Sequence, residues 1–214
     1  LGNRVWFDTD NDSSIDFVSE VGVSNVTVEL YAADGTGNPT GTALASDLTD
    51  ANGYYLFDYL FPGDYVVVIP ADEFVAGSPL GGTLEGYWSS ATSIAADGTI
   101  SETAITGLTD DDQDSDDNGT LQASGDVISV AITLGTAVDS EPSGETDLGP
   151  DGDGFQPPAR SNLTVDFGFY KTEIGNLVFG DVDKNGNYES ATDTLYSGVT
   201  VQLSGPLTPP TVSV

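Results

Sequence analysis

The sequence predicts an all-β protein, an antiparallel β-sandwich that carries long acidic loops. Three observations lead to this fold class: short segments in which apolar and polar residues alternate, glycine-containing turns between them, and no long segment with helical periodicity. A period of two places successive side chains on opposite faces of a strand. Each sheet then has one apolar face, and two such faces bury each other in a sandwich.

Four segments show this alternation most clearly, and each is rich in the β-branched and aromatic side chains that favour strands. In chain order, the apolar faces consist of Val26, Val28 and Leu30; Tyr65, Val67 and Ile69; Ile128, Val130, Ile132 and Leu134; and Leu163, Val165, Phe167 and Phe169. Turns are expected at 50–53 and 61–64, because both contain glycine and the second also contains proline. Each apolar face is expected to point into the core.

Three regions do not fit the strand pattern. Residues 71–125 form a long excursion in which only 87–94 and 99–105 have the character of strands. Residues 109–119 are an acidic run, and 139–161 are rich in Gly, Pro, Asp and Glu. Long irregular segments in a compact domain need a separate source of order, and bound cations are a candidate.

The chain contains an internal repeat. Residues 174–214 match residues 1–41 without a gap, at a constant offset of 173. Repetition at domain length indicates a modular array. We therefore expect a complete module at 1–172 and the first part of a second, incomplete copy at 173–214, within a longer or processed polypeptide.

Charge is the extreme property of the composition. Thirty-five Asp and Glu residues face four Lys and Arg residues, which gives a formal net charge of −31. Self-repulsion on this scale opposes compaction unless cations neutralise it. The charge makes nucleic acids poor partners and disfavours anionic membrane surfaces, since binding to either needs a basic protein surface. No apolar run approaches the roughly 20 residues that span a bilayer, so membrane insertion is not expected.

The chain has no Cys, Met or His. Disulfides, cysteine nucleophiles, histidine bases and soft metal ligands are all excluded at once. Any metal ion must therefore be held by oxygen. Carboxylate pairs that would suit a glycosidase arise by chance among so many acids. Since no motif of a nucleophile elbow or phosphate loop is present, the chain is not expected to be an enzyme.

Oxygen-bearing side chains occupy every second position of a loop near the N-terminus, which is the spacing of a calcium-binding loop. These residues are Asp8, Asp10, Asp12, Ser14 and Asp16, followed by Glu20. The second repeat has Asp181, Asp183, Asn185, Asn187 and Glu189, followed by Asp193. In both copies the last acid is at position thirteen rather than twelve, and a strand precedes the loop, so this is not an EF-hand. A merely solvated acidic turn is the alternative.

The acidic run is a second candidate metal site, because adjacent carboxylates repel each other unless a cation lies between them. Its candidate ligands are Asp110, Asp112, Asp114 and Asp116, together with Asp151 and Asp153 from the later acidic loop. Asp111 and Asp117 belong to the same run. We expect several Ca²⁺ ions in all. The alternatives are a solvated loop or, with Na⁺ or K⁺ at high salt, a halophile-type charged surface.

The motifs taken together resemble a known family. They are Gly2-Asn3-x-Val5-Trp6-x-Asp8-x-Asp10-x-Asp12, Thr49-Asp50-Ala51-Asn52-Gly53-x-Tyr55-x-Phe57 and Val165-Asp166-Phe167-Gly168-Phe169-Tyr170. They are similar to the SdrD B-like repeats of bacterial surface proteins, relatives of the collagen-adhesin (Cna B-type) domains. The resemblance implies a prealbumin-like, Ig-like sandwich and tandem, calcium-stiffened spacer modules of a secreted or wall-bound protein. Related collagen-adhesin domains have a crosslinking Lys on the first strand, where this chain has Arg4 and Leu177.

The expected function is therefore a non-enzymatic structural module of an extracellular or cell-surface repeat protein: a stalk, adhesin or filament. Its partners would be neighbouring modules or other copies of itself. The short linker at 171–173 implies that calcium sets the angle between modules, which X-ray scattering with and without chelator would test. The alternative is a carbohydrate- or protein-binding adhesive module that uses an aromatic face made of Tyr54, Tyr59, Tyr87 and Trp88.

Overall fold

The computed structural model describes residues 1–78, 82–95, 97–102, 116–135, 141–142, 146–150 and 160–202 of the 214-residue chain. The chain divides into two compact units. The first consists of Leu1–Ser93 with Ile100–Lys171, and the second of Ile94–Thr99 with Thr172–Val214. The module boundaries taken from the repeat stay a prediction.

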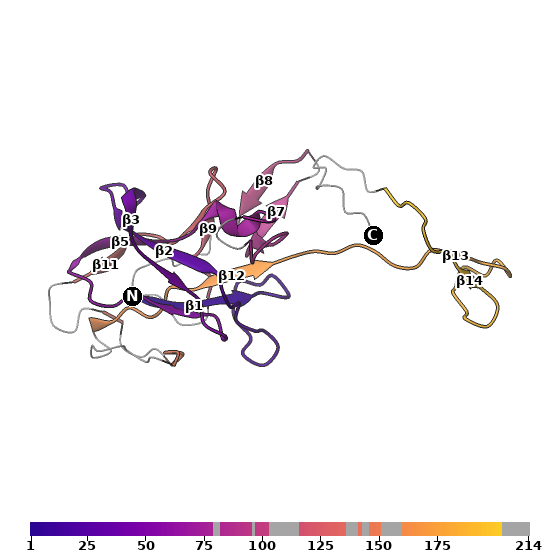
Figure 1. Ribbon diagram of the computed structural model, residues 1–214, viewed down its shortest axis with the longest axis horizontal. Coiled ribbons are helices and arrows are strands. Elements are labelled where there is room, and N and C mark those ends of the chain that lie inside the picture. The colour runs from indigo at the N-terminus through magenta and orange to yellow at the C-terminus, as the bar shows by residue number, and fades with distance from the viewer. Residues whose placement is uncertain are drawn as a thin grey trace. The chain divides into compact units, whose positions relative to one another are not determined.

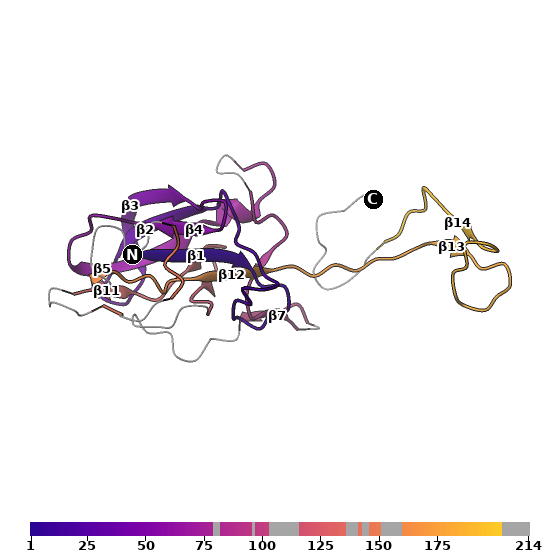
Figure 2. The same cartoon turned by 90° about the horizontal axis from the view of Figure 1, so that it is seen from below.

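A four-stranded sheet of the first unit joins segments from both ends of the predicted module. Its strands lie in the order β4 (Tyr54–Leu56), β1 (Gly2–Phe7), β12 (Phe167–Tyr170) and β6 (Trp88–Ser89). β1 pairs with β12 in parallel, with Val5 opposite Phe167, whereas the other pairs are antiparallel. Figure 2 shows β1 and β12 side by side. The prediction of antiparallel pairing fails for this pair because long crossovers allow parallel neighbours.

The second sheet of the first unit has six strands. The main path is β3 (Pro39–Leu48), β2 (Thr27–Ala33), β5 (Gly63–Ile69), β10 (Val127–Ile128) and β9 (Thr120–Leu121), and β11 (Ile132–Leu134) also pairs with β5. All of its pairings are antiparallel. The two sheets make the chain an all-β protein with a β-sandwich, as predicted (Figure 1).

The remaining elements are short. A hairpin joins β7 (Thr92–Ile94) to β8 (Ile100–Glu102), and η1 (Ala71–Phe74) is a single 3-10 turn. In the second unit, β13 (Phe179–Gly180) pairs with β14 (Thr194–Leu195). Among the described residues, no helix has the length and apolar character needed to cross a bilayer.

The core lies between the two sheets and is filled from both. Val5, Tyr55, Phe167 and Phe169 come from the four-stranded sheet, and Val28, Leu30, Tyr65, Val67, Ile69 and Val127 from the six-stranded sheet. The predicted inward faces of 26–30 and 65–69 are confirmed. Phe74 of η1 packs edge-on against Phe169, with ring centroids 5.4 Å apart. This turn therefore caps one part of the core.

The predicted face at 128–134 is wrong at its first residue. Ile132 points into the main core, but Ile128 joins a separate cluster with Val66 and Val68 on the opposite side of the sheet. Val68 is opposite Ile128 and Tyr65 is opposite Ile132, so the later strand has one extra residue between these pairs. One extra residue reverses the alternation, and a single period cannot describe both strands.

Arg4 ties the N-terminal strand to three neighbouring segments. Its guanidinium Nη1 lies 3.3 Å from Asp147 Oδ2, and its Nε donates to the Asn52 carbonyl at 3.0 Å. The guanidinium also lies over the ring of Tyr54, at 4.9 Å from its centroid, and over Phe17, at 5.6 Å. Cation–π and ionic contacts of Arg4 thus connect β1 to these segments.

Candidate metal centres

The first acidic loop begins where β1 ends, and its first residue is anchored deep in the fold. The side chain of Asp8 is fully buried, and its backbone N–H donates to the Phe169 carbonyl at 2.9 Å. The hydroxyl of Ser90, also fully buried, donates to Asp8 Oδ2 at 2.7 Å. The position of this carboxylate is therefore fixed by β1, by β12 and by Ser90, the residue that follows β6.

Two carboxylates hold the loop in shape by accepting backbone N–H groups. Asp8 accepts from Asp12 at 3.2 Å and from Ser13 at 2.9 Å. Glu20, which is only 5% exposed, accepts from Thr9 at 2.5 Å and from Asp16 at 3.0 Å. The loop thus closes on itself, with its first and last acids facing each other.

Three carboxylates of this loop converge. Ligand oxygens of Asp8, Asp10 and Glu20 all lie within 4.8 Å of one another. Desolvation, followed by the negative charges of Asp12, Glu20 and Asp8, raises the pKa of Asp10. Hard oxygen ligands at this spacing fit Ca²⁺, which takes six to eight oxygens at about 2.3–2.6 Å.

The other predicted ligands of the first loop are engaged with the backbone. Asp12 Oδ1 accepts from the Ser14 N–H at 2.9 Å, and Asp16 Oδ1 accepts from the Val18 N–H at 2.9 Å. The hydrogen bond from the Val18 N–H, followed by one from the Ser19 hydroxyl, lowers the pKa of Asp16. The converging group of acids does not include Asp12 or Asp16. The roles of Asp12, Ser14 and Asp16 as ligands stay predictions.

The second loop repeats the same local structure at an offset of 173. Seven hydrogen bonds of the first loop recur between the corresponding groups of the second. Asp181 accepts from Asn185 and Gly186, as Asp8 does from Asp12 and Ser13. Asp193 takes the place of Glu20 although its side chain is one methylene shorter, and it accepts from Val182 and Glu189.

The carboxylates of the second loop also converge in the same way. Oxygens of Asp181, Asp183 and Asp193 lie within 4.8 Å of one another. The amide of Asn185 donates to Asp183 at 2.8 Å and to Glu189 at 2.9 Å, and its Oδ1 accepts from the Asn187 N–H at 2.7 Å. Whether Asn185, Asn187 and Glu189 bind metal stays a prediction.

Both loops contain two residues with positive φ at the same positions. Asn11 and Lys184 have φ of 58° and 61°, and Ser13 and Gly186 have φ of 66° and 83°. A left-handed backbone costs a residue with a Cβ about 1–2 kcal/mol, and glycine avoids this cost. Ser13 therefore carries a strain that Gly186 does not.

Replacing Ser13 with glycine is expected to raise the free energy of unfolding by about 0.5–1 kcal/mol, because the relief of strain exceeds the entropy cost of glycine. Chemical denaturation of the calcium-free protein measures this. The matched control is Ser14→Gly, since Ser14 does not have a positive φ. That control is expected to lower stability, and equal effects of the two substitutions would contradict the strain.

The structure places one residue of the predicted second site beside the first loop. Asp116 forms an isolated antiparallel bridge with Ser14. The next residue, Asp117, is 1% exposed, and its N–H donates to the Ser13 carbonyl at 3.1 Å. The remaining candidate ligands of this site lie outside the described residues: Asp110, Asp112, Asp114, Asp151 and Asp153.

Sequence reasoning did not single out Asp117 or Ser90. Asp117 is one of six aspartates in the acidic run, and only its contacts with Gly119 and Gly168 distinguish it. Asn118 pairs with Asp166, each backbone N–H donating to the other residue at 2.9 and 2.7 Å. The closing motif of the module, which contains Asp166, was therefore a signal for this site, because it pairs with Asn118 at the end of the acidic run.

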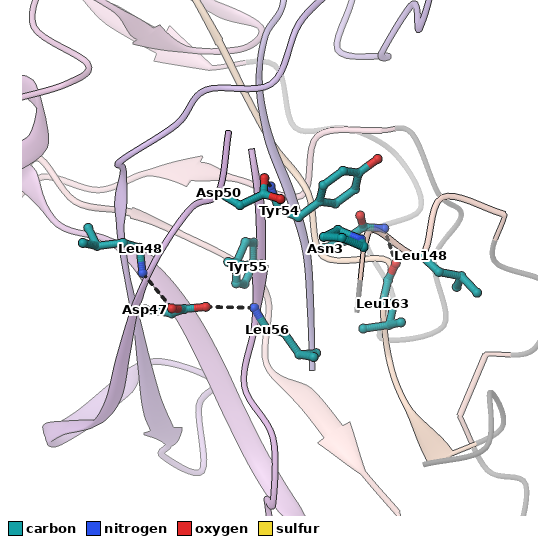
Figure 3. Close-up of a pocket in the computed structure, with 10 residues that line it drawn as sticks. Asn3, Asp47, Leu48, Asp50, Tyr54, Tyr55, Leu56, Leu148 and Leu163 are labelled. Atoms are coloured by element: carbon teal, nitrogen blue, oxygen red, sulfur yellow. Dashed lines mark hydrogen bonds between the residues drawn. The ribbon is translucent and has the colours of Figure 1, made fainter. Parts of the chain in front are cut away.

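A pocket of about 180 Å³ lies between β1, β3 and β4 in the first unit (Figure 3). Its carboxylates already serve the backbone: Asp47 accepts from Leu48 and Leu56 at 2.9 and 3.1 Å, and Asp50 from Asn52 and Tyr54 at 2.7 and 2.9 Å. A binding pocket needs polar groups that converge on a ligand. Because Asp47 and Asp50 already accept backbone hydrogen bonds, we do not take this pocket as a candidate ligand site.

The four aromatic residues of the predicted adhesive face lie on different parts of the first unit. Tyr54 and Trp88 belong to β4 and β6, which are the two opposite edges of the four-stranded sheet. Tyr87 stacks on Phe7, with centroids 4.6 Å apart, whereas Tyr59 is 82% exposed. The adhesive alternative stays a prediction, and its four residues do not share one strand or edge.

The sequence of this chain matches one protein-family model and several known proteins. Residues 1–116 match the sequence model of the SdrD B-like domain. The chain is 29% identical over 206 residues, 95% of its length, to serine-aspartate repeat-containing protein D of Staphylococcus aureus (strain Newman). It is 41% identical over 75 residues to Colossin-B and 40% identical over 82 residues to Colossin-A, both of Dictyostelium discoideum, matches that cover 31% and 37% of the chain.

The chain spans only 11%, 2% and 1% of the lengths of these three relatives, respectively. The family match covers more than half of the chain and includes the whole first acidic loop, both strands that flank the Asp50–Gly53 turn and the Ser14–Asp116 bridge. On this match, the chain belongs to the SdrD B-like domain family.

Proposed function

We propose that this chain is a non-enzymatic structural part of a secreted or cell-surface repeat protein and that Ca²⁺ makes it rigid. One ion binds at Asp8, Asp10 and Glu20, and another at Asp181, Asp183 and Asp193. The bound ions neutralise part of the charge of −31 and hold each loop in one conformation. Its partners are neighbouring modules of the same chain.

The recurrence of one loop geometry in two places is the observation that carries this proposal. Asp8 is fully buried and hydrogen-bonded to Ser90, whereas Asp181 is only half-buried in a different unit, yet the same seven hydrogen bonds form within both loops. A solvated acidic turn does not require three carboxylates to converge against their mutual repulsion. Convergence in both loops supports a cation as the shared reason.

The relatives support the structural role. One relative is named as a repeat-containing protein, and the chain itself contains a repeat at an offset of 173. Modules that repeat along a chain form quasi-linear objects in which each contacts its neighbours. Placement at the cell surface agrees with the absence of oxidation-prone Cys and Met and with an acidic chain that cations neutralise.

Native mass spectrometry in the presence and absence of Ca²⁺ tests the proposal. Glu20→Gln and Asp193→Asn are each expected to remove one bound ion from the spectrum and to weaken binding at that loop at least tenfold, about 1.4 kcal/mol. Each substitution keeps the size of the side chain but removes its charge. The double variant is expected to lose both ions.

Asp72→Asn is the matched control, because Asp72 is an exposed carboxylate of η1 outside both loops. It is expected to leave the number of bound ions unchanged. The proposal fails if the two loop variants bind as many ions as the unmodified chain, or if the control loses as many as they do.

A further inference from the structure

The place that β1 occupies in the first unit has a strand on each side. β4 pairs with β1 in antiparallel orientation, with Asn3 opposite Tyr55. On the other side β12 pairs with it in parallel, with Val5 opposite Phe167. Hydrogen bonds between backbones give a strand its affinity for a sheet, whereas its side chains decide which sequence fits. A different strand can therefore take this place if its side chains match.

Three positions of β1 restrict which sequence fits between β4 and β12. A Cβ on Gly2 would lie 2.3 Å from the Tyr55 carbonyl oxygen, a backbone atom, so this position needs glycine. Asn3 is 4% exposed, and its side-chain amide donates to the Leu163 carbonyl. Val5 is fully buried in the core. A replacement strand must present glycine, asparagine and a compact apolar residue at positions two, three and five.

The second repeat contains a segment with these same residues. At the offset of 173, positions two, three and five are Gly175, Asn176 and Val178. Position one is again apolar, as Ile174, and position eight is again an aspartate, Asp181. The segment 174–181 therefore meets the three demands of the β1 position.

The second unit does not pack this segment as the first unit packs β1. Ile174 is 84% exposed and Val178 is 36% exposed, whereas Leu1 and Val5 are 5% and 0% exposed. A Cβ on Gly175 would meet no atom within 4 Å, so its own surroundings do not require glycine. The residues that match the β1 position are thus available on the surface of the second unit.

Strand pairing in the second unit is limited to a local hairpin. Phe179 of β13 lies opposite Leu195 of β14, which repeats the Trp6–Gly22 bridge of the first unit at the offset of 173. Within the ranges that the structure describes, β13 pairs with no strand other than β14. An unpaired strand edge is a template for pairing with another chain.

We propose that residues 174–181 of one copy replace β1 in the first unit of a second copy and lie between its β4 and β12. The partner is a second copy of this chain, because its first unit offers the position that the segment matches. Each chain supplies one such strand and accepts one, so the exchange joins copies head to tail. This inference goes beyond the proposed function and does not depend on bound Ca²⁺.

The exchanged strand is expected to bind less tightly than β1 itself. Leu177 stands in place of Arg4 and cannot form its ion pair. Gly180 stands in place of Phe7 and cannot stack on an aromatic ring as Phe7 does. β1 also belongs to the same chain as its neighbours, which gives it a high effective concentration. We therefore expect exchange to become prominent only when β1 is weakened.

Sedimentation velocity of the whole chain with Gly2→Val tests the exchange. Valine at this position would overlap the Tyr55 carbonyl and expel β1, so the variant is expected to form oligomers that grow with concentration. In Gly2→Val/Gly175→Val both strands carry the clash, and these oligomers are expected to disappear. Gly175→Val alone is the matched control and is expected to sediment like the unmodified chain. A monomeric Gly2→Val, or equal association of the double variant, would overturn the inference.

Peptide binding is a second measurement, in case Gly2→Val does not fold without a strand in the β1 position. Fluorescent peptides with the sequences 1–11 and 173–184 are added to this variant, and their anisotropy is measured. Both are expected to bind, and a 173–184 peptide with Gly175→Val is expected to bind more weakly than its parent by about tenfold or more. The inference is refuted if the 173–184 peptide binds no better than its valine version, whatever the 1–11 peptide does.

Asp193→Asn separates this inference from the proposed function. It is expected to remove the ion of the second loop but to leave the association of Gly2→Val unchanged, because Asp193 lies outside 174–181. If Gly2→Val associates and Asp193→Asn loses no ion, the exchange stands and the second-loop site fails. If Asp193→Asn loses its ion and Gly2→Val stays monomeric, the loop site stands and the exchange fails.

Discussion

Removing Ca²⁺ with a chelator is expected to lower the melting temperature of the first unit by roughly 5–10 °C. An ion that binds only the folded state adds about 2.7 kcal/mol at a hundredfold excess over its Kd. For a domain of this size, each kcal/mol corresponds to roughly 2–4 °C. The buried carboxylates of Asp8 and Glu20, both less than 6% exposed, are the reason, because they repel each other once the ion is gone.

Differential scanning calorimetry in Ca²⁺, in chelator, and in chelator with Na⁺ at matched ionic strength measures this effect. Sodium is expected to recover only a small part of the lost stability, since screening acts on exposed charges rather than on a buried cluster. Glu20→Gln is expected to melt at nearly the same temperature with and without chelator if its loop is the main site. Full recovery in Na⁺ would instead indicate a halophile-type charged surface.

Replacing Gly53 with alanine is expected to destabilise the first unit by about 2–5 kcal/mol, from left-handed strain and overpacking together. Gly53 has φ of +90°, and a Cβ there would lie 2.2 Å from the Val5 carbonyl oxygen and 2.8 Å from Gly22 Cα. Both are backbone atoms, so no side chain can move aside. The Gly53 carbonyl also accepts from the Val5 N–H at 2.9 Å, which ties the turn to β1.

Urea denaturation of Gly53→Ala and of Gly35→Ala measures the effect against a matched control. A Cβ on Gly35 would meet no atom within 4 Å, and Gly35 has no positive φ. That control is expected to be neutral or slightly stabilising, because alanine restricts the unfolded chain. A loss of less than about 1 kcal/mol in Gly53→Ala would mean that the Asp50–Gly53 turn is not tightly docked on β1.

Local pattern was enough to predict much of the fold. The alternation at 26–30 and 65–69 placed Val28 and Val67 in the core, where both are fully buried. The pattern did not predict the parallel pairing of β1 with β12, because period two does not say which strands become neighbours. It also failed at Ile128, where one extra residue reversed the side-chain direction.

The residues of the candidate sites also fall into two groups: those that local spacing identified and those that only tertiary packing brought together. Spacing within a loop identified Asp8 and Glu20, whose facing positions follow from the hydrogen bonds of a short segment. Spacing did not identify Asp117, which shares Ser13 and β12 with Asp8 although it is more than a hundred residues away in sequence. Ser90 was missed for the same reason, since its bond to Asp8 joins the ends of β6 and β1, which lie on either side of β12 in the four-stranded sheet.

The repeat shows most clearly where local sequence suffices and where packing is needed. Both acidic loops adopt one hydrogen-bonded form, although Asp8 is buried and Asp181 is only half-buried, because the bonds run between residues at most eleven positions apart. The flanking apolar residues behave differently: Val28 is fully buried, whereas the corresponding Val201 is 73% exposed. Loop geometry is thus encoded locally, but burial depends on strands such as β5 and β12 that other parts of the chain supply.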